Sequence, residues 1–126
     1  LILDRDGQEA SFSVPEDPGQ IAKDLLALYW QGMQKPLPLF PKSSLEFSAY
    51  ATRFKKSRDN SDPIHKARAK WKSDSFSQFP GEGENAFFRL VFGEDDPFDD
   101  EFKNVSLMLF EPLLAHLELK EGTTLP

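Results

Sequence analysis

A run of prolines is the feature that most constrains how this chain can fold. Residues 35–41 read KPLPLFP, so prolines alternate with apolar side chains. Each proline fixes φ and lacks a backbone donor, which excludes a helix interior and a central strand. The segment is therefore predicted to be an extended connection. Connections are usually exposed and polar, so Leu37, Leu39 and Phe40 leave two interpretations open. Either the segment packs back over the preceding helix, with Phe40 filling a gap in the core, or it contacts a partner.

Length and composition indicate one globular domain. The 126 residues are enough for a single core, and 39% of them are hydrophobic. The absence of cysteine excludes a disulfide framework and cysteine metal sites. No apolar run approaches the length of a membrane span and no signal peptide is present, so we expect a cytoplasmic protein. Because the chain starts at Leu1, we expect a fragment of a longer protein.

Charge is distributed unevenly along the sequence. The net charge of -6 and the pI near 4.9 argue, taken alone, against a protein whose main function is to bind phosphates. Residues 53–72, however, carry a local charge of +6, because only Asp59 and Asp62 oppose eight basic residues. We call these eight the basic band: Arg53, Lys55, Lys56, Arg58, Lys66, Arg68, Lys70 and Lys72. The most acidic run is EDDPFDDE, residues 94–101.

The first fourteen residues predict a β-hairpin. An Asp-Gly pair at residues 6–7 separates two runs in which apolar and polar residues alternate, which is a strong signal for a two-residue turn. Pairing around that turn places Leu3 opposite Ala10. It also places Asp4 opposite Glu9, an unfavourable pair that a longer loop would relieve.

The remainder is predicted to be helical. The first helix has Asp17 as its N-cap, ends at Gly32 and carries a wide apolar stripe, so we expect it to belong to the core. A second helix is predicted to begin at a capping box formed by Ser43 and Glu46, and a third at Asp62-Pro63. A short fourth helix should cover residues 86–92 and stop at Gly93. The last helix is predicted to begin at Asp96-Pro97 and to run through Leu117, with a kink at Pro112. The expected fold is α+β and mainly helical, with a hairpin over 1–14, about five helices over 17–119, and 1–126 forming one domain or domain fragment.

Four stretches of this sequence resemble one family. In order and at similar spacing, LYWQGMQKPLPLFPKS, HKARAKW, FPGEGENAFFRLVFG and DPFDDEFKNVSLMLFEPLLAHL resemble the C-terminal end of RecC, the gamma subunit of exodeoxyribonuclease V. The resemblance covers nearly the whole chain but only the tail of that larger subunit. The chain departs from the family at ENAFF, where an acidic-proline pair is more usual.

The resemblance implies a component of the RecBCD helicase-nuclease, which processes double-strand DNA ends for recombination. It implies RecB-like and RecD-like subunits as partners and a RecC-type role that is not catalytic. That role is to hold the motor subunits and guide DNA. The C-terminal domain of the family looks like a restriction-endonuclease-type fold whose active site has decayed.

The residues themselves offer no catalytic constellation. Active nucleases of that type need an acid on one strand and, on the next, an acid and a lysine two residues apart. Glu101 and Lys103 have this spacing but fall in a helical pattern, where side chains two apart diverge. Glu118 and Lys120 fall at the fraying end of the last helix. We therefore expect no catalytic residue, no metal and no cofactor.

The other candidates for chemistry have structural explanations. The acidic run lacks the alternating ligands and the glycine of a calcium loop, and we expect Asp96 to cap a helix with Asp99 and Asp100 in its first turn. Neither histidine has partners for a metal or a nucleophile. His116 is expected at the rim of the core and His65 in solvent.

The basic band is the remaining candidate for function. Its functional interpretation is contact with the DNA backbone, because lysine and arginine neutralise phosphates without reading sequence. The alternative is a solvated helix face in a purely structural domain that docks a motor subunit and never meets DNA. Trp71 shares a helical register with Ile64 and Ala67, which favours a core position over stacking on a base.

Overall fold

The computed structural model describes residues 2–3, 9–72 and 79–119, and within them the fold is mainly helical with a small sheet. The elements in chain order are β1 (Ile2–Leu3), β2 (Glu9–Phe12), α1 (Pro18–Gln34), α2 (Pro41–Ala51), α3 (Pro63–Trp71), the 3-10 turn η1 (Glu82–Glu84), α4 (Ala86–Phe92), α5 (Asp100–His116) and β3 (Leu117–Leu119). The predicted class, a hairpin followed by about five helices, is confirmed.

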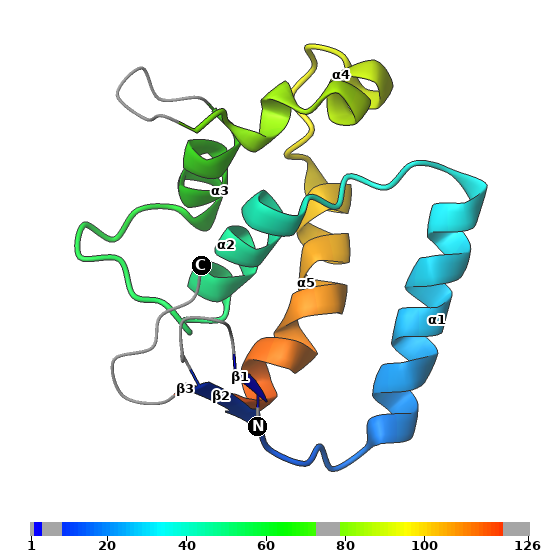
Figure 1. Cartoon of the computed structure of the whole chain (residues 1–126), viewed down its shortest axis with the longest axis vertical. Helices are drawn as coiled ribbons and strands as arrows, with labels where there is room; N and C mark the ends of the chain where they lie inside the picture. Colours follow the sequence, from blue (N-terminus) through cyan, green and yellow to red (C-terminus); the bar gives the residue numbers. More distant parts are fainter. Residues whose placement is uncertain (1, 4–8, 73–78, 120–126) are drawn as a thin grey trace.

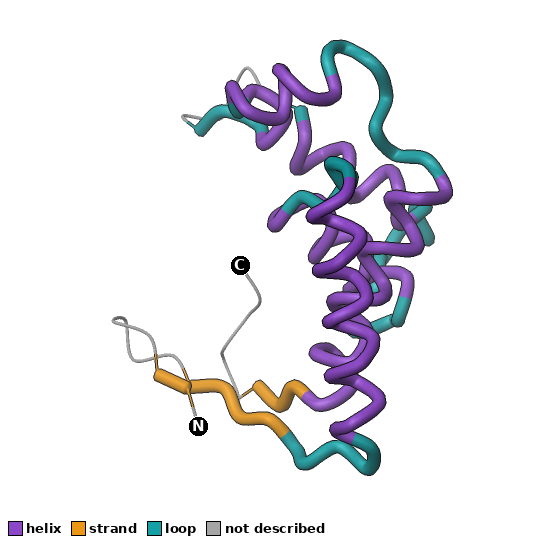
Figure 2. The backbone as a smooth tube through the Cα atoms, turned by 90° about the vertical axis from the view of Figure 1, so that its right-hand side faces the viewer, coloured by secondary structure: helices purple, strands orange, loops and turns teal. Residues whose placement is uncertain are grey.

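Four helices lie side by side in the order α1, α5, α2, α3 (Figure 1). Helix α2 packs against both α3 and α5, whereas α1 packs against α5. The strands project from one end of these helices, as Figure 2 shows. Because α1 lies at the edge of this row, only one side of it is available for packing against another helix.

The sheet corrects two expectations. Its Cα register pairs Ile2 with Ala10 and Leu3 with Glu9, one residue away from the predicted pairing. The expected two-residue turn lies outside the described residues. The second correction concerns the last helix, which ends at His116. The following LEL segment alternates apolar and polar residues and pairs with β2 as a third strand.

Helix α1 begins where the sequence predicts but is largely exposed. The Asp17 carboxylate caps it by accepting the Gln20 N–H at 3.0 Å. The helix ends at Gln34 instead of Gly32. The expected core position is wrong for most of the stripe, since only Leu28 is buried. Four large side chains are each more than 60% exposed, and we call them the α1 apolar face: Leu26, Tyr29, Trp30 and Met33.

The core is an aromatic cluster centred on Phe40. This side chain is fully buried, and among the described residues five rings surround it with centroids 4.5 to 6.4 Å away: Trp71, Phe88, Phe92, Phe98 and Phe102. The predictions that Phe40 fills the core and that Trp71 packs inside are confirmed. The rings come from α3, α4, the turn before α5 and α5 itself, so Phe40 does not pack over α1 as expected. The extended connection carries it across to the other helices.

The start of α2 differs from its prediction. The helix begins at Pro41, two residues before the predicted cap, and no local side chain caps it. Its N–H groups instead meet a remote carboxylate. Glu82 accepts the backbone N–H of Lys42 at 2.7 Å and that of Ser43 at 2.9 Å. A carboxylate at this place compensates both the unpaired donors and the positive end of the helix.

The remaining boundaries follow local signals. Asp62 caps α3 by accepting the Ile64 N–H, and α4 ends at Gly93, whose φ of +63° suits glycine. Helix α5 starts later than predicted, because Asp99 is its N-cap and accepts the Phe102 N–H at 2.9 Å. Asp96 accepts the N–H of Phe98 in the preceding turn. The helix continues through Pro112 to its end.

Candidate nucleic-acid interface

The loop between α2 and α3, residues 52–62, presents the first half of the basic band. Helix α2 stops in a tight turn, in which the N–H of Lys55 donates to the carbonyl of Ala49 at 2.9 Å and that of Arg53 to Tyr50 at 3.2 Å. Arg53 occupies the left-handed region with φ of +61°, where glycine is usual. Both ends of the loop are thereby fixed, at this turn and at the Asp62 cap.

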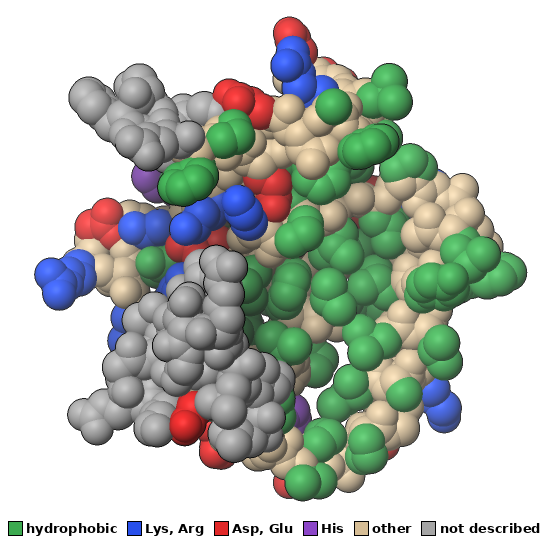
Figure 3. Space-filling view, viewed as in Figure 1, with side chains coloured by type: hydrophobic (Ala, Val, Ile, Leu, Met, Phe, Trp, Pro, Cys, Tyr) green, Lys and Arg blue, Asp and Glu red, His purple; other side chains and the backbone are tan. Residues whose placement is uncertain are grey.

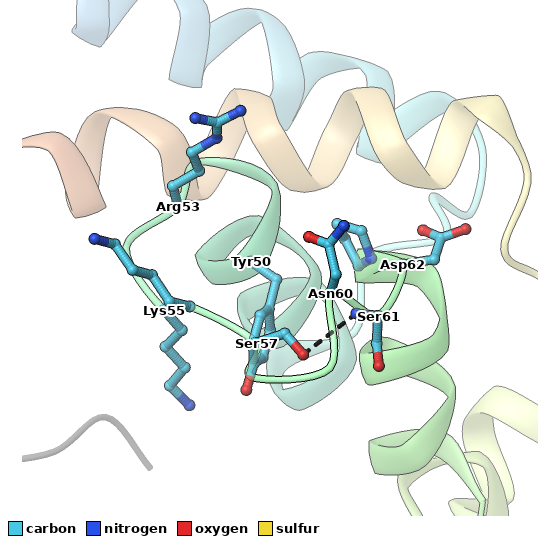
Figure 4. Close-up of a pocket in the computed structure, with 9 residues that line it drawn as sticks. Tyr50, Arg53, Lys55, Ser57, Asn60, Ser61 and Asp62 are labelled. Atoms are coloured by element: carbon cyan, nitrogen blue, oxygen red, sulfur yellow. Dashed lines mark hydrogen bonds between the residues drawn. The ribbon is translucent and has the colours of Figure 1, made fainter.

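This loop surrounds an open depression of about 550 Å³ (Figure 4). Its lining combines three cations with an aromatic ring, hydroxyls, an amide and one carboxylate: Tyr50, Arg53, Lys55, Lys56, Ser57, Asn60, Ser61, Asp62 and Pro63. Figure 4 shows the side chains of Arg53 and Lys55 extending outward from the loop. The depression is therefore an exposed, cation-bordered surface and has the character of a contact site for anions.

Three members of the basic band form ion pairs inside the domain. Lys55 Nζ lies 3.0 Å from Glu46 Oε2, and the side chain of Glu46 is only 10% exposed. Lys66 Nζ lies 3.7 Å from Asp59 Oδ1 and 5.4 Å from the centroid of the Tyr50 ring. Arg68 pairs with Asp96 in the acidic run. These cations hold elements together and are only partly available to an external anion.

Asp59 lies within this loop and remains charged. Side-chain hydrogen bonds from Ser57 and Ser61 lower its pKa below the ordinary aspartate value. The carboxylate therefore partly offsets the positive charge of this region. It also keeps Lys66 directed toward the protein through their ion pair.

The other five cations of the basic band form no ion pair with a described residue: Arg53, Lys56, Arg58, Lys70 and Lys72. The structure brings Arg53 and Lys56 together at the depression, and it places Lys70 on α3 and Lys72 just after it. Figure 3 shows basic side chains gathered on the side of the molecule that carries α3 and this loop, whereas the surface between α5 and α1 is apolar.

Sequence reasoning missed the uncharged part of the depression. The prediction from sequence did not single out Tyr50, Ser57, Asn60 or Ser61. The only signal was the turn-rich composition of SRDNSDP, residues 57–63, in which serine, asparagine and aspartate favour local backbone hydrogen bonds.

The candidate nuclease and metal residues lie apart. Glu101 and Lys103 are on α5, as predicted. Glu118 is on strand β3 instead of a fraying helix end, and Lys120 lies outside the described residues. Over residues 2–3, 9–72 and 79–119, no group of three or more His, Asp or Glu side chains is placed to hold a metal ion.

The histidines occupy the predicted environments. The Nδ1 atom of His116 lies 3.0 Å from the Ser13 hydroxyl, so this half-buried ring is hydrogen bonded at the rim. His65 is exposed on α3.

Among the described residues, no helix is both long and apolar enough to span a membrane.

The described residues form a mainly helical α+β fold with a basic surface depression on the loop between α2 and α3. In a comparison with protein families, residues 9–53 match the RecC C-terminal domain. This stretch includes the proline run, α2 and Arg53, and the match confirms the resemblance to the C-terminal region of RecC. No curated protein and no solved structure matches the chain.

Proposed function

We propose that this chain is a non-catalytic C-terminal module of an exodeoxyribonuclease V gamma subunit, and that it guides DNA during double-strand-break repair by recombination. Its partners in this proposal are DNA and the RecB-like and RecD-like subunits of a RecBCD complex in the cytoplasm. Residues 1–126 act as one domain or as part of one. The match over residues 9–53 supports the RecC assignment.

The observation that supports DNA contact is the set of cations without an internal partner. Lys56 and Arg53 border an open depression at the start of α3, whereas Lys70 and Lys72 lie at the other end of that helix, where Lys72 lines a hollow that also contains the acidic run. No ion pair with a described residue neutralises these four. They can therefore replace counterions on phosphates, a contribution that depends on salt and not on base sequence.

The test is fluorescence anisotropy with labelled single-stranded and forked DNA over a series of salt concentrations. The double variant K56E/K70E should bind more weakly and reduce the slope of log K against log salt, by about 0.7 per lost single-strand phosphate contact. The matched control K23E/R89E reverses two exposed charges on α1 and α4 and should retain the slope. The proposal would be refuted if both double variants lost DNA affinity equally, or if the unaltered chain showed no salt-dependent binding at all.

A second candidate function is supported by the α1 apolar face. Four large apolar side chains in solvent on one helix are typical of a surface that a partner protein covers. In this alternative the chain is a docking domain for a helicase or nuclease subunit and has no DNA contact. Co-purification of the full RecC-type subunit with its RecB-like and RecD-like partners tests the docking, which L26E/W30E should abolish and K56E/K70E should leave intact. The alternative holds if the assembled complex that carries K56E/K70E binds DNA as tightly as the unaltered complex.

A further inference from the structure

We infer that Arg53 is the anchoring phosphate contact of the depression, an inference that rests on the DNA contact proposed above. The argument begins at the backbone. Arg53 has φ of +61° at the position after α2 where the chain turns out of the helix. Left-handed backbone is unfavourable for a residue with a Cβ atom, and glycine takes it freely.

The turn itself does not require arginine. It is built from backbone hydrogen bonds, from Arg53 N–H to the carbonyl of Tyr50 and from Lys55 N–H to that of Ala49. A glycine at position 53 would make the same bonds at lower conformational cost. Asn60 is the other described non-glycine residue with positive φ, at +54°, but asparagine tolerates this region well. Arg53 is thus the residue whose presence the backbone does not explain.

The Arg53 side chain is not used inside the described part of the domain. The residue is exposed and borders two hollows, the depression on one side and a second one of about 390 Å³ on the other. Glu111 of α5 lines the second hollow, yet no ion pair joins it to Arg53. Lys55, the nearest basic neighbour along the depression, is held by Glu46. The guanidinium therefore remains available to a ligand.

The chemistry of the position favours a phosphate group. A guanidinium presents paired N–H donors that match two phosphate oxygens, and this geometry is stronger and more specific than the point charge of lysine. Lys56 adds a second cation at the same depression. The ligand class that fits is the phosphodiester of a single-stranded nucleic acid, whose backbone can follow the exposed loop.

The test compares three single variants by thermal melting and by anisotropy with a labelled single-stranded oligonucleotide at low salt. R53G should raise the melting temperature by about 2 to 5 °C, because it relieves the backbone, and should weaken binding about tenfold. R53K keeps the charge and the strained backbone but loses the paired donors. Its affinity should therefore lie between that of the unaltered chain and that of R53G. The control R89K makes the same exchange at an exposed position on α4, away from the depression, and should retain full affinity.

The outcomes separate this inference from the proposed function. If R53G binds as tightly as the unaltered chain while K56E/K70E binds weakly, the Arg53 assignment is wrong and DNA contact stands. If R53G melts at a lower temperature, Arg53 is needed for the fold and the inference is also wrong. If the unaltered chain shows no salt-dependent binding, both proposals fail together.

Discussion

The Glu82 carboxylate caps helix α2 by accepting the Ser43 N–H at 2.9 Å, although the two residues are 39 positions apart in the chain. The second carboxylate oxygen accepts the neighbouring N–H at 2.7 Å. This contact joins the η1–α4 segment to the start of α2, next to the buried ring of Phe40.

Removal of the Glu82 carboxylate should destabilise the domain. We expect E82A to lower the free energy of unfolding by about 1 to 2 kcal/mol, because two helix N–H groups lose a charged acceptor. Urea denaturation followed by circular dichroism measures the change. The control E94A removes a carboxylate from the exposed acidic run and should change stability by less than about 0.5 kcal/mol. Equal effects would show that general charge, not the cap, is responsible.

Gly83 should not tolerate a side chain. A Cβ atom at this position would lie 2.5 Å from two atoms of the Trp71 indole, too close for any contact. G83A should therefore cost about 1 to 3 kcal/mol and shift the tryptophan emission as the indole moves. In the control G19A the new Cβ meets only an ordinary contact at 3.5 Å, so stability should be retained or improved. An unchanged G83A protein would contradict the packing described here.

Substitutions of Phe40 and Trp30 should have opposite consequences. F40A removes a fully buried ring from the centre of the cluster and should cost about 3 to 5 kcal/mol. W30A truncates a side chain that is 62% exposed on the α1 apolar face and should change stability by no more than about 0.5 kcal/mol. Both changes in the free energy of unfolding can be measured from the midpoints of denaturant unfolding curves. A large loss for W30A would indicate that α1 packs more closely than the structure shows.

Two buried serines should respond differently to alanine. Within the described part of the chain, the Ser106 hydroxyl is buried without a hydrogen-bond partner, so S106A should be neutral or stabilise by up to about 1 kcal/mol. The equally buried Ser44 hydroxyl accepts the Phe40 N–H at 2.9 Å, and S44A should destabilise by about 1 to 3 kcal/mol because that donor loses its acceptor. Calorimetry on the pair gives the comparison, and a reversed order would refute it.

Local signals predicted much of the fold. The caps at Asp17 and Asp62 and the stop at Gly93 depend on residues within one turn, and the structure confirms each of them. The Glu82 cap and the third strand were not predictable, because both depend on partners distant in the chain. The apolar stripe of α1 was misassigned for a related reason. Periodicity identifies an apolar face but not whether another element covers it.

The sequence predicted which charged residues the candidate site contains, but not how they are arranged in space. The eight basic residues are readily identified in the sequence, but only the folded chain shows that Lys55, Lys66 and Arg68 pair internally. The left-handed backbone of Arg53 gives no sequence signal either, because glycine is absent from the turn. Which cations remain for a ligand is therefore a property of the tertiary structure.

The pairing of β2 with β3 closes the chain into one large loop, since Phe12 lies opposite Leu117. During synthesis the sheet gains its third strand only after all five helices have left the ribosome. A chain truncated after His116 would keep just two short strands, which are marginal in water. Proteolytic removal of this last strand would thus abolish the pairing of β2 with the C-terminal segment, while the backbone hydrogen bond from Ser13 to His116 would still join the two ends of the helical part.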